Sequence, residues 1–150
     1  MLTIRPAGAA DVPTLESIAE AAYLPWVPRI GRPPGPVSAD YGAAVRRGEA
    51  WLAGEGSLAV GLIVLIPEPG CLLLESVAVV PSAQGRGVGT RLLEFAEERA
   101  RELDLPEIRL YTNAAMTENI AYYSRRGYTE THRGEEHGFS RVYFSKRLDR

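Results

Sequence analysis

The residues best suited to bind an anion form a glycine-rich segment between a predicted strand and a predicted helix. Its members are Gln84, Gly85, Arg86, Gly87, Val88, Gly89 and Thr90. Glycine lets the backbone approach a ligand closely and adopt conformations that are unfavourable for other residues. Because the segment opens a helix, its unpaired N–H groups and the positive end of the helix dipole can face a phosphate or pyrophosphate. The side chain of Arg86 can add a charged hydrogen bond.

Two familiar nucleotide-binding motifs do not fit this segment. A Walker A loop needs a lysine followed by serine or threonine after its last glycine, whereas Thr90 and Arg91 stand here. A dinucleotide fingerprint needs glycine at the position that Thr90 occupies. A tight turn that binds no ligand remains the alternative to an anion site.

Asn119 and Tyr123 form a second candidate group. They are four residues apart, so a helix over 117–126 places them on one face, one turn apart. An amide and a phenol placed in this way can contact one extended ligand, and the phenol can act as a general acid. Met116 and Ile120 share helical spacing with Tyr123, so a core position for this ring is the alternative.

Glu75 is the candidate general base. It lies in a predicted strand over 71–80, where alternation places it on one face with Leu73, Val77 and Val79. A carboxylate among such neighbours is costly to bury unless it has a partner or a function, and burial would raise its pKa. The alternatives are that Glu75 lies in water at the open end of the sheet, or pairs with an arginine.

These residues must be positioned by a mixture of strands and helices. Hydrophobic spacing, glycines and prolines predict strands over 2–5, 51–53, 58–66, 71–80, 108–111, 128–131 and 139–146. They predict helices after Asp11, over 40–47, from Val88 to just before Pro106, and over 117–126 with Gly127 as a stop. Residues 23–37, with five prolines, read as an irregular loop. This order predicts an α/β fold whose mixed sheet carries helices on both faces.

Length and composition limit the broad class of protein. A chain of 150 residues suits one compact domain over 1–150. A net charge of -2 gives no reason to expect nucleic acid or an anionic membrane as a partner. The one cysteine, Cys71, permits no internal disulfide and is expected to be buried and inert. The longest apolar run, 58–66, is too short to span a membrane, and the N-terminus does not resemble a signal peptide, so a cytoplasmic location is expected.

Metal and nucleophile chemistry find little support in the sequence. His132 and His137 flank a polar turn without the spacing of a metal site, so no metal is expected. Ser76 and Ser124 have no visible histidine and aspartate partners for a catalytic triad.

The glycine-rich segment resembles the acetyl-CoA pyrophosphate loop of the GNAT family of N-acetyltransferases. The family pattern, Q/R-x-x-G-x-G/A after an apolar strand, matches Gln84, Gly87 and Gly89 after the run Val77-Ala78-Val79-Val80-Pro81. In the family, backbone N–H groups of this loop hold the pyrophosphate, and the strand pairs with the pantetheine arm. The resemblance therefore assigns the pyrophosphate to residues 84–90 and the arm to the backbone of residues 77–79.

Residues 119–128 resemble a second recurrent stretch of that family: Asn, then an aromatic–Tyr pair, then Gly and an aromatic. The resemblance implies that Asn119 contacts the coenzyme A arm and that Tyr123 protonates the leaving thiolate. A glutamate upstream on the strand often serves as the base, which points to Glu75. Tyr122 is one position from the match, and we assign it to packing elsewhere on the helix. The family also implies a mostly antiparallel central sheet.

The expected activity is acetyl-CoA-dependent transfer of an acetyl group, without a metal, directly to a primary amine of a small molecule or peptide. A non-catalytic acyl-CoA sensor and a regulatory module that docks a protein through the proline-rich loop are the alternatives. A homodimer is an expectation from the family alone. Over residues 23–41, Tyr23, Trp26 and Tyr41 can form walls of the acceptor pocket. Arginines at 29 and 32 would suit an anionic acceptor, whereas Asp40 with Glu75 would suit a cationic one.

Overall fold

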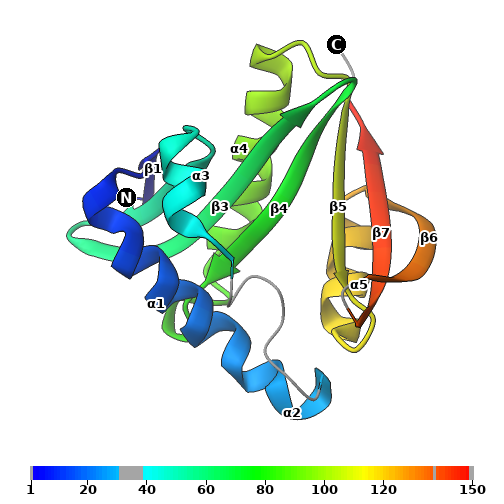
Figure 1. The fold of residues 1–150 in the computed structure, drawn as a ribbon, viewed down its shortest axis with the longest axis horizontal. Coiled ribbons are helices and arrows are strands. Elements are labelled where there is room, and N and C mark those ends of the chain that lie inside the picture. The colour runs from blue at the N-terminus through cyan, green and yellow to red at the C-terminus, as the bar shows by residue number, and fades with distance from the viewer. Residues whose placement is uncertain (1, 31–38, 137, 149–150) are drawn as a thin grey trace.

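One seven-stranded mixed sheet forms the centre of the computed structural model, which describes residues 2–30, 39–136 and 138–148 (Figure 1). The strand order is β1-β2-β3-β4-β5-β7-β6, and all neighbours are antiparallel except the parallel pair β4 and β5. The strands are β1 (Leu2–Pro6), β2 (Ala50–Glu55), β3 (Leu58–Glu68), β4 (Cys71–Val79), β5 (Glu107–Asn113), β6 (Thr129–Glu136) and β7 (Phe139–Arg147). The predicted mixed, mostly antiparallel sheet is confirmed.

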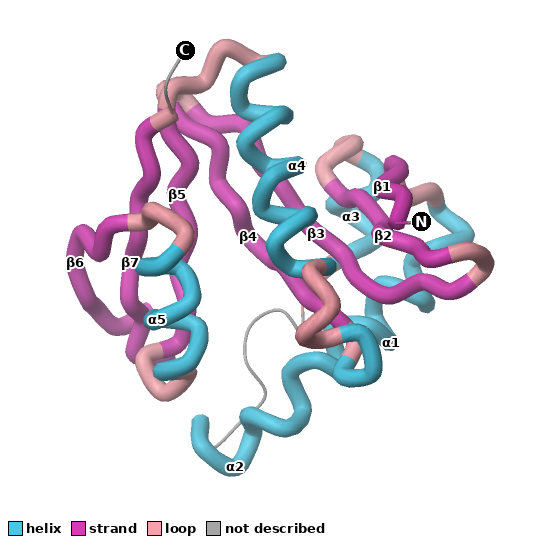
Figure 2. Tube along the Cα trace, turned by 180° about the vertical axis from the view of Figure 1, so that it is seen from behind, coloured by secondary structure: helices cyan, strands magenta, loops and turns pink. Residues whose placement is uncertain are grey.

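Helices cover both faces of the sheet, also as predicted (Figures 1 and 2). On one face, α1 (Val12–Tyr23) and α3 (Tyr41–Arg46) pack against β2, β3 and β4 to form one core. On the other face, α4 (Val88–Glu102) and α5 (Thr117–Arg125) form the larger core. The α4 stripe runs through Leu92, Ala96 and Ala100, each fully buried at helical spacing.

Two predicted helix starts differ in their capping. Asp40 caps α3, because its carboxylate accepts a hydrogen bond from the Ala43 N–H at 2.9 Å. Asp11 stands just before α1, but its carboxylate accepts from the Arg5 guanidinium at 2.9 Å and from the Gly8 N–H at 2.8 Å. The predicted capping bond from Asp11 to the first turn of α1 is therefore absent, because a charged partner on β1 holds the carboxylate.

The expected irregular loop is helical over its first part. Helix α1 runs through Tyr23 and is followed by a 3₁₀ turn, Leu24–Trp26, and a short helix α2, Val27–Ile30. Pro25 and Pro28 both occupy second positions of these elements, where a missing N–H costs no helical hydrogen bond. Proline content alone therefore gave the wrong prediction here, and residues 31–38 lie outside the described residues.

The sheet opens between its two parallel strands. β4 and β5 pair only through Leu72, Leu73 and Leu74, opposite residues 108–110, although both strands continue well beyond these pairs. Past Leu74 the two strands separate, and the sheet divides into β1–β4 and β5–β7–β6 (Figure 1). The separation exposes one backbone edge of β4 in the middle of the molecule.

A β-bulge lies at the point where the strands part. Leu65 of β3 pairs with Leu74, but the preceding Val64 pairs with Ser76, so Glu75 has no partner on β3. Leu74 before the bulge and Val77 after it both pack into the α4 core. The extra residue thus interrupts the alternation of faces, and the prediction that Glu75 shares a face with Val77 and Val79 is wrong.

Candidate active site

A cleft extends between β4 and β5 beyond their last pair. It consists of a cavity of about 410 Å³ beside α4 and a smaller cavity of about 40 Å³ beside β5 and β7. Five residues line both cavities: Tyr23, Val77, Met116, Asn119 and Tyr123. The two cavities therefore meet at these residues, where a ligand in one can touch a ligand in the other.

The glycine-rich segment forms one end of the larger cavity. Gly85 and Gly87 line it with φ angles of 80° and 83°, in the left-handed region, and Gly87 is the N-cap residue of α4. The first N–H groups of this 15-residue helix have no acceptor within the helix. Gln84 ties the segment to β4, because its Nε2 donates to the Val79 carbonyl at 3.0 Å. This end of the cavity thus combines a helix N-terminus with left-handed glycines, the features on which the predicted anion site depends.

Two side chains of the segment point away from the cleft. Arg86 forms an ion pair with Glu55 at the end of β2 and does not line the cavity. Val88 is buried in the α4 core, so only its backbone can face a ligand. The charged hydrogen bond expected from Arg86 would require this side chain to leave Glu55.

The open edge of β4 offers two N–H groups to the larger cavity. The Val80 N–H donates to the Val60 carbonyl at 2.9 Å, so the backbone N–H and C=O groups of residues 76, 78 and 80 point toward β3. The backbone groups of the alternate residues, Val77 and Val79, point toward the cleft. The carbonyl of Val77 accepts a hydrogen bond from the Tyr23 hydroxyl at 2.6 Å, and the carbonyl of Val79 accepts one from Gln84. Their N–H groups have no strand opposite them, because β5 pairing ends at Leu74.

Replacing Gly87 by alanine is expected to lower the free energy of unfolding by about 1–2 kcal/mol. A Cβ at this φ of 83° is strained, although it would meet no other atom within 4 Å. Gly89→Ala is the matched control, because Gly89 has no positive φ and a Cβ there would make only ordinary contacts, 3.6 Å from the Tyr122 hydroxyl. Urea unfolding of both variants measures the difference, and equal losses would contradict the strain argument.

Helix α5 carries Tyr123 to the junction of the two cavities. Its ring packs against Tyr128 and Phe144 with centroids 5.9 Å apart in each pair, so the core alternative is confirmed for the ring. The residue nevertheless lines both cavities, and among the described residues no group hydrogen-bonds its hydroxyl. Burial, with a smaller effect of Tyr122, raises the pKa of Tyr123 well above its usual 10. The phenol is therefore protonated at neutral pH.

Asn119 lies one turn before Tyr123 and also faces both cavities. Among the described residues, its side chain makes one hydrogen bond, a weak one from Nδ2 to the Met116 sulfur at 3.9 Å. The amide is thus available to a ligand, in agreement with the predicted spacing of the pair.

Tyr122 also lines the cleft, contrary to its assignment to packing elsewhere on α5. It lines the larger cavity, and its hydroxyl lies 3.0 Å from the Thr90 hydroxyl in the first turn of α4. Arg126 lies over its ring at 5.2 Å and lines the same cavity. Consecutive helical residues are about 100° apart, so a wide cleft can receive both Tyr122 and Tyr123.

Glu75 lines the smaller cavity from the bulge of β4. It is partly buried, and burial raises the pKa of its carboxyl group above the usual 4.5. Repulsion by Glu49 and Glu68 adds to this rise, and Arg47 opposes it. The structure therefore gives Glu75 the raised pKa that the sequence predicted, although through a different face of the strand.

Two side chains of the smaller cavity were missed by sequence reasoning. Tyr111 of β5 and Arg141 of β7 line it together with Glu75. The Arg141 side chain is only 8% exposed, and its guanidinium lies 4.2 Å from the centre of the Tyr111 ring. An arginine within a strand of mixed polar and apolar residues gives no sequence signal of such burial.

The other residues expected to shape the acceptor pocket have different positions. Tyr23 lines both cavities, as expected of a wall. Tyr41 does not, because it is 1% exposed in the α1 core and hydrogen-bonds Ser76. Asp40 caps α3, and the side chains of Trp26 and Arg29, with Arg32, lie outside the part of the structure that is described.

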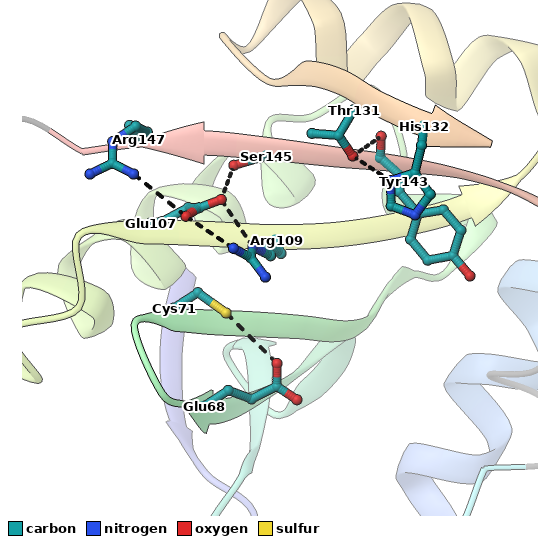
Figure 3. Close-up of polar contacts among 9 residues, drawn as sticks. All are labelled: Glu68, Cys71, Glu107, Arg109, Thr131, His132, Tyr143, Ser145 and Arg147. Carbon is teal, nitrogen blue, oxygen red and sulfur yellow. Dashed lines mark hydrogen bonds and ion pairs between the residues drawn. The ribbon is translucent and has the colours of Figure 1, made fainter. Parts of the chain in front are cut away.

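The remaining polar candidates make local contacts. The Cys71 thiol is buried and lies 3.7 Å from a Glu68 oxygen, and the His132 ring stacks on Tyr143 at 4.3 Å (Figure 3). Over residues 2–30, 39–136 and 138–148, no group of three or more His, Cys, Asp or Glu side chains could hold a metal ion. None of the helices found there is long and apolar enough to cross a membrane.

Comparison with known proteins gives one family. The model of the Acetyltransferase (GNAT) family matches residues 15–128, which is more than half of the chain. The chain is 39% identical over 70 residues to the uncharacterized protein YxbD of Bacillus subtilis, a match covering 46% of this chain and 42% of that protein. It is 32% identical over 59 residues to the aminoalkylphosphonate N-acetyltransferase of Salmonella typhimurium, covering 39% and 38%.

The matches to these two curated relatives span about two-fifths of their length. Among solved structures, the paiA N-acetyltransferase of Thermoplasma acidophilum in complex with coenzyme A has a TM-score of 0.79 to this fold. Its sequence is 17% identical, and the alignment covers 99% of each chain. At this identity the likeness concerns the fold.

Proposed function

Because the chain belongs to the GNAT family of acetyltransferases, we propose that it transfers the acetyl group of acetyl-CoA directly to a primary amine. The observation that carries the proposal is the cleft between β4 and β5. It has the N-terminus of α4 at one end, the open edge of β4 along its side, and Glu75 and Tyr123 near the other end.

The residues of the larger cavity fit a coenzyme A molecule. The space before Gly87 is open, since a Cβ there would meet no atom within 4 Å, and the first N–H groups of α4 are available to a pyrophosphate. Along β4, the carbonyls of Val77 and Val79 already have donors within the protein, so N–H groups remain to pair with the amide carbonyls of a pantetheine arm. Asn119 can contact the same arm from α5.

The chemistry assigns one task to each group at the junction. Acetyl-CoA supplies an acetyl group on a reactive thioester. The amine nitrogen must lose a proton, since its usual pKa is about 10.4, and the Glu75 carboxylate takes this proton directly or through water. The Val77 N–H donates to the thioester oxygen as the C–N bond forms. Tyr123 gives its proton to the sulfur as the C–S bond breaks.

A sensor that only binds acyl-CoA is the alternative proposal. It would need the α4 loop and the β4 edge, but it would need neither a carboxylate with a raised pKa nor a protonated phenol where the two cavities meet. Both groups are present beside the cleft, which favours the enzyme.

Calorimetry with acetyl-CoA, followed by a thiol-release assay against amines, amino acids, polyamines and peptides, tests the proposal. We expect binding at micromolar to millimolar concentration and release of one thiol per amine acetylated. No heat of binding and no thermal shift at millimolar acetyl-CoA would overturn the proposal. Binding without thiol release from any amine would identify the sensor instead.

A further inference from the structure

The smaller cavity is lined by both a cation and an acid. Glu75 comes from the bulge of β4, and Arg141 comes from β7, beyond β5. Arg141 is the only charged residue that is buried among the described residues. An arginine is rarely buried without a strong partner, so its contacts indicate what the cavity can bind.

The protein satisfies only part of the Arg141 guanidinium. Its Nη1 lies 3.2 Å from Oε1 of Glu136, a residue whose side chain is 50% exposed. One face of the group stacks on Tyr111, which holds the guanidinium in place beside the cavity. The guanidinium also makes a hydrogen bond to the Tyr143 side chain. A guanidinium has five N–H donors in a planar fork, and these two partners leave donors that can bind an oxyanion.

The other arginines of these three strands are arranged differently. Arg109 and Arg147 are exposed and both pair with Glu107, which also accepts a hydrogen bond from Ser145 (Figure 3). Arg133 is exposed and makes two hydrogen bonds to Glu130. Surface pairs of this kind contribute little and point to no ligand. Among the arginines in the described part of β5, β6 and β7, Arg141 alone is buried against a cavity.

We propose that the acceptor is a small zwitterionic amine, an amino acid or aminophosphonate whose oxyanion binds Arg141 while its amine faces Glu75. This inference rests on the proposed function and names the substrate class of the same site. The volume of about 40 Å³ favours a small acceptor. A carboxylate and a phosphonate offer the same acceptor chemistry to the guanidinium.

Matched amines with and without an oxyanion test the inference. The pairs are 3-aminopropanoate with propylamine, and 2-aminoethylphosphonate with ethylamine. For the wild-type protein we expect kcat/KM to be at least about 10-fold higher for the oxyanion member of one or both pairs. A preference within only one pair would show whether the site takes a carboxylate or a phosphonate. Equal values within both pairs would overturn the inference and leave the proposed function standing.

The variant Arg141→Gln should lower kcat/KM for the preferred zwitterion by about 10- to 100-fold, mainly through the KM of the acceptor. The value for the matched amine without an oxyanion and the KM for acetyl-CoA should change less than about threefold. Arg133→Gln, on the exposed β6 strand, is the matched control and should change neither. Equal losses for both amines would assign Arg141 a structural role and overturn the inference.

If Arg141→Gln does not fold, Arg141→Lys keeps the positive charge and should retain part of the preference. Loss of activity of Arg141→Lys on both amines would again mean a structural role. This variant and the wild-type comparison therefore together test whether Arg141 binds the oxyanion. Thiol release from no amine would overturn the proposed function, and this inference with it.

Discussion

Replacing Tyr123 by phenylalanine is expected to lower kcat for acetyl transfer by about 100- to 1000-fold. The change removes only the hydroxyl and keeps the ring that packs against Tyr128 and Phe144. Because burial raises the pKa of Tyr123 above 10, the wild-type phenol holds its proton at every pH used in assays. Affinity for acetyl-CoA, measured by calorimetry, should stay within about threefold. Steady-state kinetics with a saturating acceptor gives kcat.

Tyr122→Phe is the matched control on the same helix. It removes the hydroxyl that lies 3.0 Å from the Thr90 hydroxyl at the start of α4, in the larger cavity, which Glu75 does not line. We expect a rise in the KM for acetyl-CoA of a few-fold with little change in kcat, since one neutral hydrogen bond is lost. A kcat of Tyr123→Phe within threefold of wild type would remove the acid role from Tyr123.

Local sequence signals predict most of the lining of the larger cavity. The glycines of the loop, the apolar strand before it and the helix after it are neighbours in the chain, so spacing predicts their arrangement. The same holds for Asn119 and Tyr123, which one helical turn brings to one face. In both regions the structure places the backbone or side chains at the larger cavity.

The lining of the smaller cavity depends on long-range strand pairing, which residue spacing does not show. The bulge at Glu75 exists because of the register between β3 and β4, and a strict alternation therefore placed this residue on the wrong face. Arg141 reaches the cavity because β7 pairs beside β5 just where β5 leaves β4. The ion pair between Arg86 and Glu55, 31 positions earlier in the chain, is likewise a long-range contact that residue spacing does not show.

The bulge and the parting of the strands have a combined effect. The bulge frees Glu75 from β3, and the loss of β5 pairing after Leu74 frees the β4 edge beside it. One short segment of β4 thus presents a carboxylate to the smaller cavity and N–H groups to the larger one. A regular, fully paired strand would satisfy those N–H groups within the sheet and could not hold an extended ligand there.

Replacing Glu75 by glutamine is expected to lower kcat/KM for the amine by about 100-fold, the usual contribution of a positioned base. In the wild type, kcat/KM should fall as the pH drops through the pKa of Glu75, at a value above 4.5. Glu49→Gln removes a charge that raises this pKa and should move that limb of the pH profile to lower pH. An unmoved limb, or full activity of Glu75→Gln, would exclude Glu75 as the base.

Glu75→Gln should also be more stable than the wild type at neutral pH. The carboxyl of Glu75 has a higher pKa in the folded protein than the 4.5 of an unperturbed group, so between these two values the folded state binds more protons than the unfolded state. Stability from this residue is then complete below pH 4.5 and is lost as the pH rises through the folded pKa. Glutamine does not ionise, so the melting temperature of Glu75→Gln should exceed that of the wild type at pH 7.5. The difference between the two melting temperatures should shrink toward pH 4.5. A melting-temperature difference that grows toward low pH would contradict the assigned burial of Glu75. The expected trend would show that the protein keeps this carboxylate in the cavity although it lowers the stability of the fold.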